Sequence, residues 1–496
     1  MRSQAYPSLY QVNTRVSLTS LSASLGHRAI LDDIPDQDLD RFVALGFEWI
    51  WLLSVWQTGS AGQHLSRRNP IWRKEFEETL IDLKDEDIGG SGFAIRSYTV
   101  SNEIGGEEAL KRFRQRLSDR GLKLMLDFVP NHTAIDNIWV AEHPDFFIRG
   151  SEALLAREPM NYTRVETGQS DIVLAHGRDP YFPGWVDTLQ LDYGNPDLEE
   201  AMKNELVKIS GMCDGVRCDM AMLVLPEVFE KTWGIRCRPF WPDAIRRAKE
   251  SNPSFTLMAE VYGDMEWTMI QQGFDYAYDK RLYDRLKEGF AKPVREHFHA
   301  SQDYQSHMTR FLENHDEQRA AKEFPDGKYQ AAAVLTFLSP GMKFFHQGQM
   351  EGRLKKVSPH LVRAPEEPPV DSLIEFYEKL FKLLKMPVLR YGNWQLTECT
   401  QAWEGNRSFE KYIAFTWEGN DNERILITVN YSSARGQCYV RIPFKGLENS
   451  DWILTDLYSG NSFVRQGDDL KTRGLYLDEP GWKIYIFSLG KGPSDS

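Results

Sequence analysis

The feature that most constrains the fold is a repeated alternation of short, mostly apolar segments with longer amphipathic segments. Segments such as FEWIWLL and KLMLDFV are apolar at nearly every position rather than at every second position. Such runs are typical of parallel strands that are covered on both faces. Between them, residues 106–120 place Leu110, Phe113 and Leu117 on one helical face, and residues 371–386 follow the same period. The alternation predicts a parallel sheet whose strands are joined by helices.

The pattern contains eight candidate strands, and each ends in polar residues that precede a helical segment. Eight repeats of this kind predict a (β/α)8 barrel, in which the loops after the strands build the active site. The predicted strands are residues 8–13, 47–53, 123–129, 215–219, 255–261, 274–279, 310–316 and 342–348.

Two parts of the chain depart from the repeat. About 60 residues separate the third strand from its helix, which is too long for a simple crossover and predicts a small subdomain over the barrel mouth. From residue 389 onwards, short alternating segments such as RILITVNY and WKIYIFSL predict an antiparallel β-sandwich. The predicted domains are therefore a barrel at 1–132 and 195–388, an inserted subdomain at 133–194, and a C-terminal sandwich at 389–496.

The charge balance excludes several partners. The chain has 59 Lys and Arg against 72 Asp and Glu, a formal charge of −13, and no dense basic run, so we expect no nucleic acid or anionic membrane as a partner. Neither an apolar leader nor a run of 18 apolar residues occurs in the sequence, which predicts a cytosolic protein without a membrane span. The five cysteines lack CxxC spacing, so neither disulfides nor a zinc site is expected.

Three acidic residues, Asp219, Glu260 and Asp316, each close an apolar segment predicted as a barrel strand. Carboxyl groups at the barrel mouth are partly desolvated, so their ionisation can be tuned. Hydrolysis of a glycosidic bond with retained configuration needs one carboxylate to attack the anomeric carbon and a second carboxyl group to protonate the leaving oxygen. The three residues are therefore the candidate catalytic groups.

Other polar side chains share the same predicted mouth. Arg217 lies two residues before Asp219, on the same face of the strand, and would keep that carboxylate ionised. His132 and His315 would donate hydrogen bonds to sugar hydroxyls. Asp127, at the end of the third strand, is expected to orient its neighbours through hydrogen bonds.

Four segments resemble the motif regions of the alpha-amylase family of glycoside hydrolases, in the family's order. They are DFVPNH at 127–132, GVRCDMAM at 215–222, AEVY at 259–262 and ENHDEQR at 313–319. The resemblance implies that Asp219 is the nucleophile, Glu260 the general acid/base and Asp316 the group that stabilises the transition state. It also implies that His132, Arg217 and His315 line the subsite where the sugar is cleaved.

The sequence departs from the family pattern at several positions. Phe93 stands where a tyrosine usually stacks under the cleaved sugar. Met222 and Leu223 replace a Lys-His pair on the leaving-group side, which weakens the case for an enzyme that cuts within starch chains.

A family calcium site would use Asn131 with an aspartate, but Gln190 stands at that second position. A hard cation prefers carboxylate oxygens, so Gln190 weakens the site, although calcium is possible through Asn131, Asp187 and Asp192. The sequence favours the absence of calcium, and no cofactor is expected to be required.

The leading interpretation is a retaining glycoside hydrolase that acts on α-glucosides or malto-oligosaccharides through a covalent glycosyl-Asp219 intermediate. A transglycosidase or a phosphorylase of the same family would share that intermediate, and the sequence leaves both open. A non-catalytic carbohydrate-binding barrel is disfavoured because Asp219, Glu260 and Asp316 are all present. The sequence does not indicate the oligomeric state.

Overall fold

Eight parallel strands form a closed barrel in the order β1-β14-β13-β12-β11-β10-β5-β2. The structure is a computed structural model that describes residues 6–167, 171–325, 327–420 and 422–492. The (β/α)8 prediction is confirmed. The barrel strands are β1 (Ser8–Asn13), β2 (Trp49–Leu53), β5 (Lys123–Phe128), β10 (Gly215–Cys218), β11 (Thr256–Ala259), β12 (Tyr276–Tyr278), β13 (Met308–Arg310) and β14 (Met342–His346).

The seventh predicted strand, at residues 310–316, does not match the observed strand β13. β13 ends at Arg310, where the prediction began, so the predicted strand at 310–316 is wrong and the ENHD segment is a loop. The side chain of Asn314 accepts hydrogen bonds from the backbone N–H groups of Asp316 and Glu317, at 2.8 and 2.9 Å. Such a local turn competes with the sheet ladder, which an apolar run alone does not reveal.

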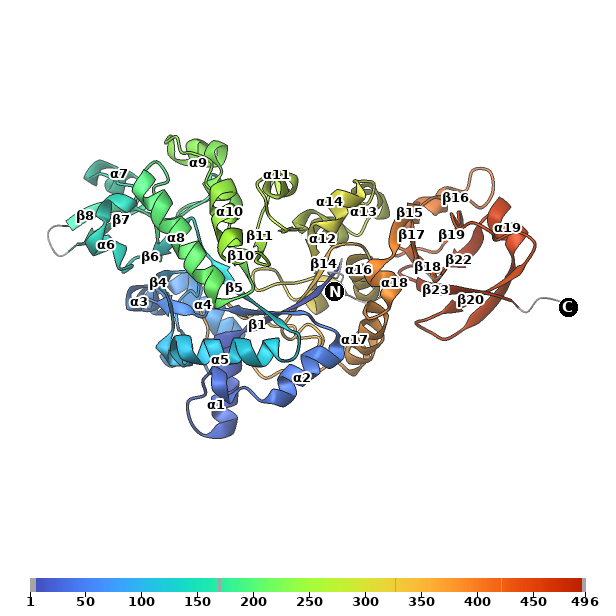
Figure 1. Cartoon of the computed structure of the whole chain (residues 1–496), viewed down its shortest axis with the longest axis horizontal. Helices are drawn as coiled ribbons and strands as arrows, with labels where there is room; N and C mark the ends of the chain where they lie inside the picture. Colours follow the sequence, from blue (N-terminus) through green and yellow to red (C-terminus); the bar gives the residue numbers. More distant parts are fainter. Residues whose placement is uncertain (1–5, 168–170, 326, 421, 493–496) are drawn as a thin grey trace. The chain divides into compact units, whose positions relative to one another are not determined.

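The chain divides into two compact units. The first, called here the amino-terminal unit, comprises residues 9–278 and 355–367; the second, the carboxy-terminal unit, comprises residues 1–8, 279–354 and 368–496. In the amino-terminal unit, α8 and α10 pack side by side (Figure 1). Its longer helices are α1 (Thr14–Leu25), α2 (Asp36–Leu45), α3 (Ser60–Arg68), α4 (Pro70–Thr79), α5 (Gly106–Ser118), α8 (Pro196–Met212), α9 (Pro226–Trp233), α10 (Trp241–Ser251) and α11 (Glu266–Gln271).

The segment between β5 and α8 forms small antiparallel sheets. β6 (His132–Ala134) pairs with β9 (Thr188–Gln190), and β7 (Tyr162–Glu166) pairs with β8 (Asp171–Ala175). Two short helices accompany them, α6 (Trp139–Glu142) and α7 (Glu152–Arg157). The domain boundaries drawn from the sequence remain a prediction.

The carboxy-terminal unit contains two antiparallel sheets, as the alternating segments predicted. One sheet has the order β15-β17-β18-β23-β20-β21 and the other the order β16-β19-β22. Side chains from both sheets, among them Leu426, Phe487, Cys438 and Leu477, share one apolar core. The strands are β15 (Asn393–Thr397), β16 (Cys399–Gln401), β17 (Tyr412–Glu418), β18 (Arg424–Asn430), β19 (Gly436–Val440), β20 (Asp451–Asp456), β21 (Ser462–Gln466), β22 (Leu475–Glu479) and β23 (Ile484–Lys491).

The helices of this unit either follow barrel strands or lead into the sheets. They are α12 (Lys280–Glu288), α13 (Ala291–His297), α14 (Gln302–Ser306), α15 (Ala320–Glu323), α16 (Lys328–Phe337), α17 (Asp371–Leu384), α18 (Pro387–Tyr391) and α19 (Gly467–Thr472).

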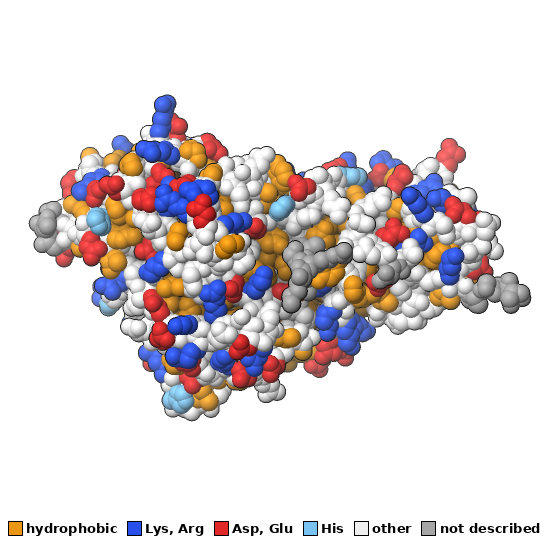
Figure 2. All heavy atoms as spheres, viewed as in Figure 1, with side chains coloured by type: hydrophobic (Ala, Val, Ile, Leu, Met, Phe, Trp, Pro, Cys, Tyr) orange, Lys and Arg blue, Asp and Glu red, His pale blue; other side chains and the backbone are white. Residues whose placement is uncertain are grey.

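The surface carries interspersed charges of both signs. Figure 2 shows basic and acidic side chains clustered over α8 and α10, where Asp243 pairs with Lys203 at 2.8 Å and with Arg246 at 2.6 Å. Among the described residues, no helix has the length and apolar character needed to cross a bilayer.

A buried ion cluster centres on Asp279 in the carboxy-terminal unit. Its Oδ2 atom lies 3.0 Å from His297 Nε2 and 3.1 Å from Arg310 Nη1. Its Oδ1 atom accepts a hydrogen bond from the backbone N–H of Leu282 at 3.0 Å and so caps α12. Burial alone would raise the pKa of Asp279, but His297 and Arg310 hold it below its usual value.

Asp279→Asn should lower the free energy of unfolding by about 3–5 kcal/mol, because it leaves the Arg310 charge buried without its partner. Stability that depends on the Asp279 carboxylate is present above its unfolded pKa and is lost as the pH falls through its lowered folded pKa. Urea unfolding curves at neutral and acidic pH measure both effects. Arg407→Ala, which breaks the exposed Arg407–Glu410 pair, is the control and should cost less than about 1 kcal/mol. An equal cost for the two variants would contradict the argument.

Candidate active site

The register of β10 and β11 sets Asp219 and Glu260 opposite each other. Cys218 pairs with Ala259, and each carboxylate is the residue that follows. The backbone N–H of Glu260 donates to Cys218 O at 3.0 Å, which continues the pairing by one step. Both side chains are buried. The sequence prediction that these two carboxylates lie together at strand ends agrees with this geometry.

Arg217 connects the two carboxylates. Its Nη1 donates to Asp219 Oδ1 at 2.6 Å, and its Nη2 lies 2.7 Å from Glu260 Oε2. The guanidinium is fully buried and lies 5.5 Å from the ring centroid of Trp51 and 5.1 Å from that of Phe93. A buried charge is tolerated only when it is paired, and here one cation serves two carboxylates.

Glu260 has further partners that the sequence did not reveal. The backbone N–H of Met220 donates to its Oε2 at 2.7 Å, and the Tyr262 hydroxyl donates to its Oε1 at 2.8 Å. Met220 has a φ of 43°, in the left-handed region that costs energy for a residue with a side chain. The motif AEVY contains Tyr262, but nothing in the sequence showed that its hydroxyl reaches the carboxylate two residues earlier.

Asp127 lies beside this pair and contacts the neighbouring strands. Asp127 on β5 is the register partner of Arg217 on β10. The Arg217 Nη1 atom lies 3.9 Å from Asp127 Oδ1. Trp51 Nε1 donates to the same oxygen at 3.2 Å, and the Ser54 backbone N–H donates to Oδ2 at 3.4 Å. Burial raises the pKa of Asp127 to about 7. The orienting role of Asp127 remains a prediction.

His132 and Met222 are both buried in the same unit. Burial, together with the Arg217 charge, lowers the pKa of His132 to about 3, so its imidazole is neutral. Its ring lies 5.0 Å from the ring of Trp185, and its Nδ1 lies 3.4 Å from Asn131 Nδ2. Met222 is in a short 3-10 turn at Ala221–Val224 that follows Asp219.

Asp316 and His315 belong to the carboxy-terminal unit. His315 Nε2 lies 2.9 Å from Asp316 Oδ2, and the Asp316 side chain is 42% exposed. In the same loop Glu313 pairs with Arg319 at 2.5 Å and accepts from the Ala320 backbone N–H at 2.6 Å. The loop is therefore fixed by its own side chains, and the roles of Asp316 and His315 toward a substrate remain predictions.

Asn131, the first of the calcium candidates, contacts the side-chain amide of Gln190. The two N–H groups of Gln190 Nε2 are shared among three oxygens, which are Asn131 O at 2.9 Å, Asn131 Oδ1 at 3.0 Å and Leu191 O at 3.1 Å. An amide N–H competes with a cation for the same lone pairs, so these oxygens do not fit a calcium ion. Within the described ranges, no group of three or more His, Cys, Asp or Glu side chains could hold a metal ion.

The two remaining calcium candidates, Asp187 and Asp192, differ in their hydrogen bonds. Asp187 is buried, its pKa is raised by burial to about 6, and its Oδ2 has no hydrogen-bond partner in the part of the chain that the structure describes. Asp192 Oδ1 instead accepts from the Gly194 backbone N–H at 2.9 Å.

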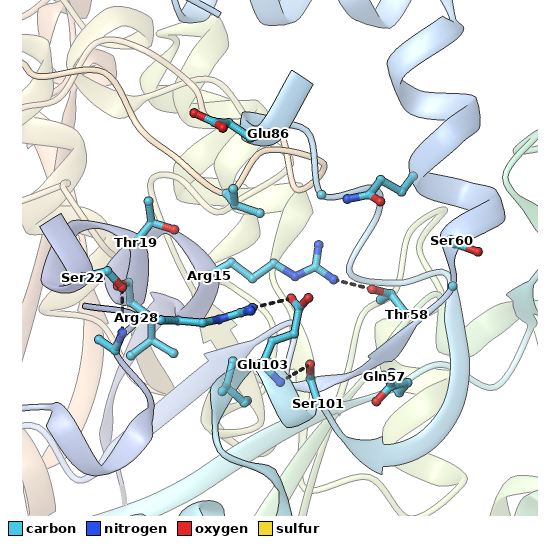
Figure 3. A pocket seen from close by; sticks show the side chains of 17 residues that line it. Arg15, Thr19, Ser22, Arg28, Gln57, Thr58, Ser60, Glu86, Ser101 and Glu103 are labelled. Carbon is cyan, nitrogen blue, oxygen red and sulfur yellow. Dashed lines mark hydrogen bonds and ion pairs between the residues drawn. The ribbon is translucent and has the colours of Figure 1, made fainter. Parts of the chain in front are cut away.

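A separate cavity of about 420 Å³ occurs in the amino-terminal unit (Figure 3). The Arg15 side chain extends into it and donates to Gly90 O at 2.7 Å and to Thr58 Oγ1 at 3.1 Å. Arg28 and Glu103 form an ion pair at 3.1 Å along one side. Among the described residues that line this cavity there is none of the buried carboxylates around Arg217, so it is distinct from the candidate active site.

The fold and this cluster define a class, namely (β/α)8 barrel proteins with buried carboxylates at the ends of adjacent strands. Comparison with known proteins is more specific. The family model for the alpha amylase catalytic domain matches residues 36–425. The chain belongs to the alpha-amylase family of glycoside hydrolases.

Curated relatives are distant and longer. The alpha-amylase MalA of Haloarcula japonica is 23% identical over 284 residues, which are 55% of this chain and 38% of that protein. The salivary alpha-glucosidase of Anopheles gambiae is 25% identical over 181 residues, 34% of this chain and 26% of that protein. The chain thus spans well under half the length of these relatives.

Solved structures share the fold over nearly the whole chain. A noncanonic maltogenic alpha-amylase, AmyB from Thermotoga neapolitana, superimposes with a TM-score of 0.69 at 20% identity, and 98% of this chain and 99% of that one are covered. A debranching enzyme from Nostoc punctiforme gives a TM-score of 0.63 at 18% identity, with coverage of 98% and 99%. At these identities the likeness concerns the fold.

Asp127→Asn should flatten the pH dependence of stability between about pH 4 and pH 7. The folded chain keeps a proton on Asp127 up to its raised pKa of about 7, whereas the unfolded chain loses that proton near pH 4. Stability of the unmodified chain should therefore fall as the pH rises through this window. Urea midpoints measured from pH 4 to pH 8 test this. Asp119→Asn, at the exposed end of α5, is the control and should leave the curve unchanged, and an unaltered curve for Asp127→Asn would contradict the assignment.

Proposed function

We propose that the chain is a retaining glycoside hydrolase that acts on α-glucosides or malto-oligosaccharides. The observation that carries the proposal is the pair of buried carboxylates, Asp219 and Glu260, held by the two terminal nitrogens of Arg217. Two carboxyl groups side by side are what retaining hydrolysis requires. Membership of the alpha-amylase family and the names of its relatives support the choice of α-linked glucosides.

The electrostatics suit one ionised and one protonated group. Three buried carboxyl groups, those of Asp127, Asp219 and Glu260, surround a single guanidinium. Because one cation cannot neutralise three anions in a desolvated site, the cluster favours the uptake of at least one proton. Asp127, with its raised pKa of about 7, takes up one such proton. In the proposed cycle Glu260 carries a second proton, which it gives to the leaving oxygen, while Asp219 is held as the carboxylate by its 2.6 Å ion pair with Arg217.

In the proposed first step, Asp219 attacks the anomeric carbon as the bond to the leaving oxygen breaks, and Glu260 gives its proton to that oxygen. In the second step, Glu260 takes a proton from water, the water oxygen attacks the anomeric carbon, and the bond to Asp219 breaks. Asp316 would stabilise positive charge on the sugar ring. Neutral His132 would donate a hydrogen bond to a sugar hydroxyl, and Phe93 would offer a ring face to the sugar.

We also propose that folding requires no calcium. The hydrogen bonds from Gln190 to the oxygens of Asn131 support this proposal. The buried Gln190 amide already supplies N–H groups to the oxygens of Asn131 and Leu191. The proposal concerns the Asn131 region, where the family resemblance places the metal.

Asp219→Asn should lower turnover at least about 10⁴-fold and Glu260→Gln about 10²- to 10⁴-fold, because each removes a group that acts in the chemical step. Glu230→Gln, an exposed residue on α9, is the matched control and should keep full activity. The assay incubates each variant with maltose, maltoheptaose, sucrose and trehalose, with and without phosphate, and follows the anomeric configuration of the first product by proton NMR.

The products separate the alternatives. Glucose or shortened maltodextrins that appear first as α-anomers support hydrolysis with retention. Longer oligosaccharides would instead indicate a transglycosidase, and sugar phosphate formed only with added phosphate would indicate a phosphorylase. Wild-type activity in the Asp219→Asn variant would overturn the role given to that residue.

Chelation should leave the melting temperature of the purified chain unchanged, because the Asn131 oxygens are already satisfied by Gln190. Gln190→Glu should lower the melting temperature, since it places a negative charge among three oxygens, and added calcium should then restore part of the loss. Differential scanning calorimetry with and without calcium measures both. A chelator-induced fall in the unmodified chain that calcium reverses would refute the proposal.

A further inference from the structure

The loop between Gly177 and Trp185 presents two large aromatic side chains to solvent. Tyr181 is 74% exposed and Phe182 is 68% exposed. The loop is nonetheless ordered at its tip, because Asp179 Oδ1 accepts hydrogen bonds from the backbone N–H groups of Tyr181 at 2.6 Å and Phe182 at 3.0 Å. Adjacent exposed rings on a fixed turn expose apolar surface that folding does not use, which marks a contact surface.

The base of the loop rests on a residue of the candidate active site. Gly177 and Trp185 form an antiparallel bridge, with Trp185 N–H donating to Gly177 O at 2.8 Å. The Trp185 ring lies 5.0 Å from the His132 ring. A side chain at Gly177 would place its Cβ 2.7 Å from His132 Cβ, so the backbone approaches closely enough to require glycine.

The loop is also tied to α9, which begins seven residues after Asp219. Lys231 on α9 donates to the Tyr181 hydroxyl at 3.0 Å, and its ammonium lies 4.5 Å from the Tyr181 ring centroid. Arg178 donates to Thr232 O at 3.3 Å and lies 4.7 Å from the Trp233 ring centroid. The loop is thus held by segments that follow the barrel strands β5 and β10, the segments to which His132 and Asp219 belong.

We propose that Tyr181 and Phe182 form a stacking platform for a glucosyl unit of an α-glucan chain, at a distance from the unit that is cleaved. The proposal rests on the proposed function. Aromatic faces suit the C–H faces of sugar rings, and a neutral, hydroxyl-rich chain can also accept hydrogen bonds from Lys231. The continuity of the loop with His132 and α9 favours a glucan that runs from the carboxylates rather than a protein partner.

The platform should matter for long substrates and not for short ones. A disaccharide that occupies the cleavage position does not reach a second, separate stacking surface. A longer oligosaccharide reaches this surface. The stacking contact stabilises the bound substrate and the transition state equally, so it lowers KM and leaves kcat unchanged.

The test measures kcat/KM for maltoheptaose and for maltose in the full chain and in the double variant Tyr181→Ala/Phe182→Ala. We expect kcat/KM for maltoheptaose to fall about tenfold, mainly through KM, and kcat/KM for maltose to stay within about twofold. Tyr181→Trp/Phe182→Trp should restore maltoheptaose activity, because it keeps the ring faces. Phe290→Ala, which removes a ring that is 66% exposed in the carboxy-terminal unit, is the matched control and should change neither substrate.

A second readout does not depend on turnover. In the Glu260→Gln background, calorimetric titration with maltoheptaose should show about tenfold weaker binding when both rings are removed. Unchanged binding and an unchanged ratio of the two kcat/KM values would overturn the platform. A change of oligomeric state in the double variant with an unchanged ratio would also overturn it and would assign the rings to contact between copies.

The proposed function can fail separately. If the unmodified chain turns over none of the α-glucosides, the proposed function is wrong whatever the rings do. If it turns over maltose and maltoheptaose but the ring variants lose activity equally on both, only the platform is wrong.

Discussion

The buried guanidinium of Arg217 is the interaction on which the candidate site depends. Its two terminal nitrogens contact Asp219 and Glu260 at 2.6 and 2.7 Å, and Asp127 lies at 3.9 Å. Without this cation the buried carboxyl groups would take up further protons instead of staying ionised. With it, they can be close together and still differ in protonation, which is what acid/base chemistry at a glycosidic bond requires.

Arg217 holds this position because of the barrel. β10 lies between β5 and β11, so one residue of β10 has neighbours on both sides at the same level. In parallel strands all carboxyl ends meet at one edge, which places the residues that follow Cys218 and Ala259 next to each other. The rings of Trp51 and Phe93 then cover the guanidinium and keep water from its faces.

The long segment between β5 and α8 contacts the candidate active site and carries the proposed glucan platform. Gly177 allows the backbone of this segment to approach His132, and Gln190 fixes Asn131 through two hydrogen bonds, to its backbone and side-chain oxygens. Both contacts join residues far apart in the sequence to the segment that directly follows β5. The same segment presents Tyr181 and Phe182 at its tip, so a single excursion both braces the proposed catalytic region and offers a surface to a longer ligand.

The sequence by itself determined the barrel, the antiparallel sheets after residue 389 and the placement of Asp219 and Glu260 at strand ends. These features follow from local patterns, since apolar runs and helical periodicity are properties of neighbouring residues. It failed at residues 310–316, where a turn at Asn314 replaces the expected strand, because a hydrogen bond from the backbone to a polar side chain cannot be recognised in an apolar pattern. Only the tertiary structure decided that Tyr262 contacts Glu260, that Gln190 serves Asn131 and that Tyr181 and Phe182 are exposed while Trp185 packs on His132. The physical reason is that hydrogen-bond geometry and burial depend on which distant segments meet, and those meetings are fixed by the register of the barrel and the path of its loops.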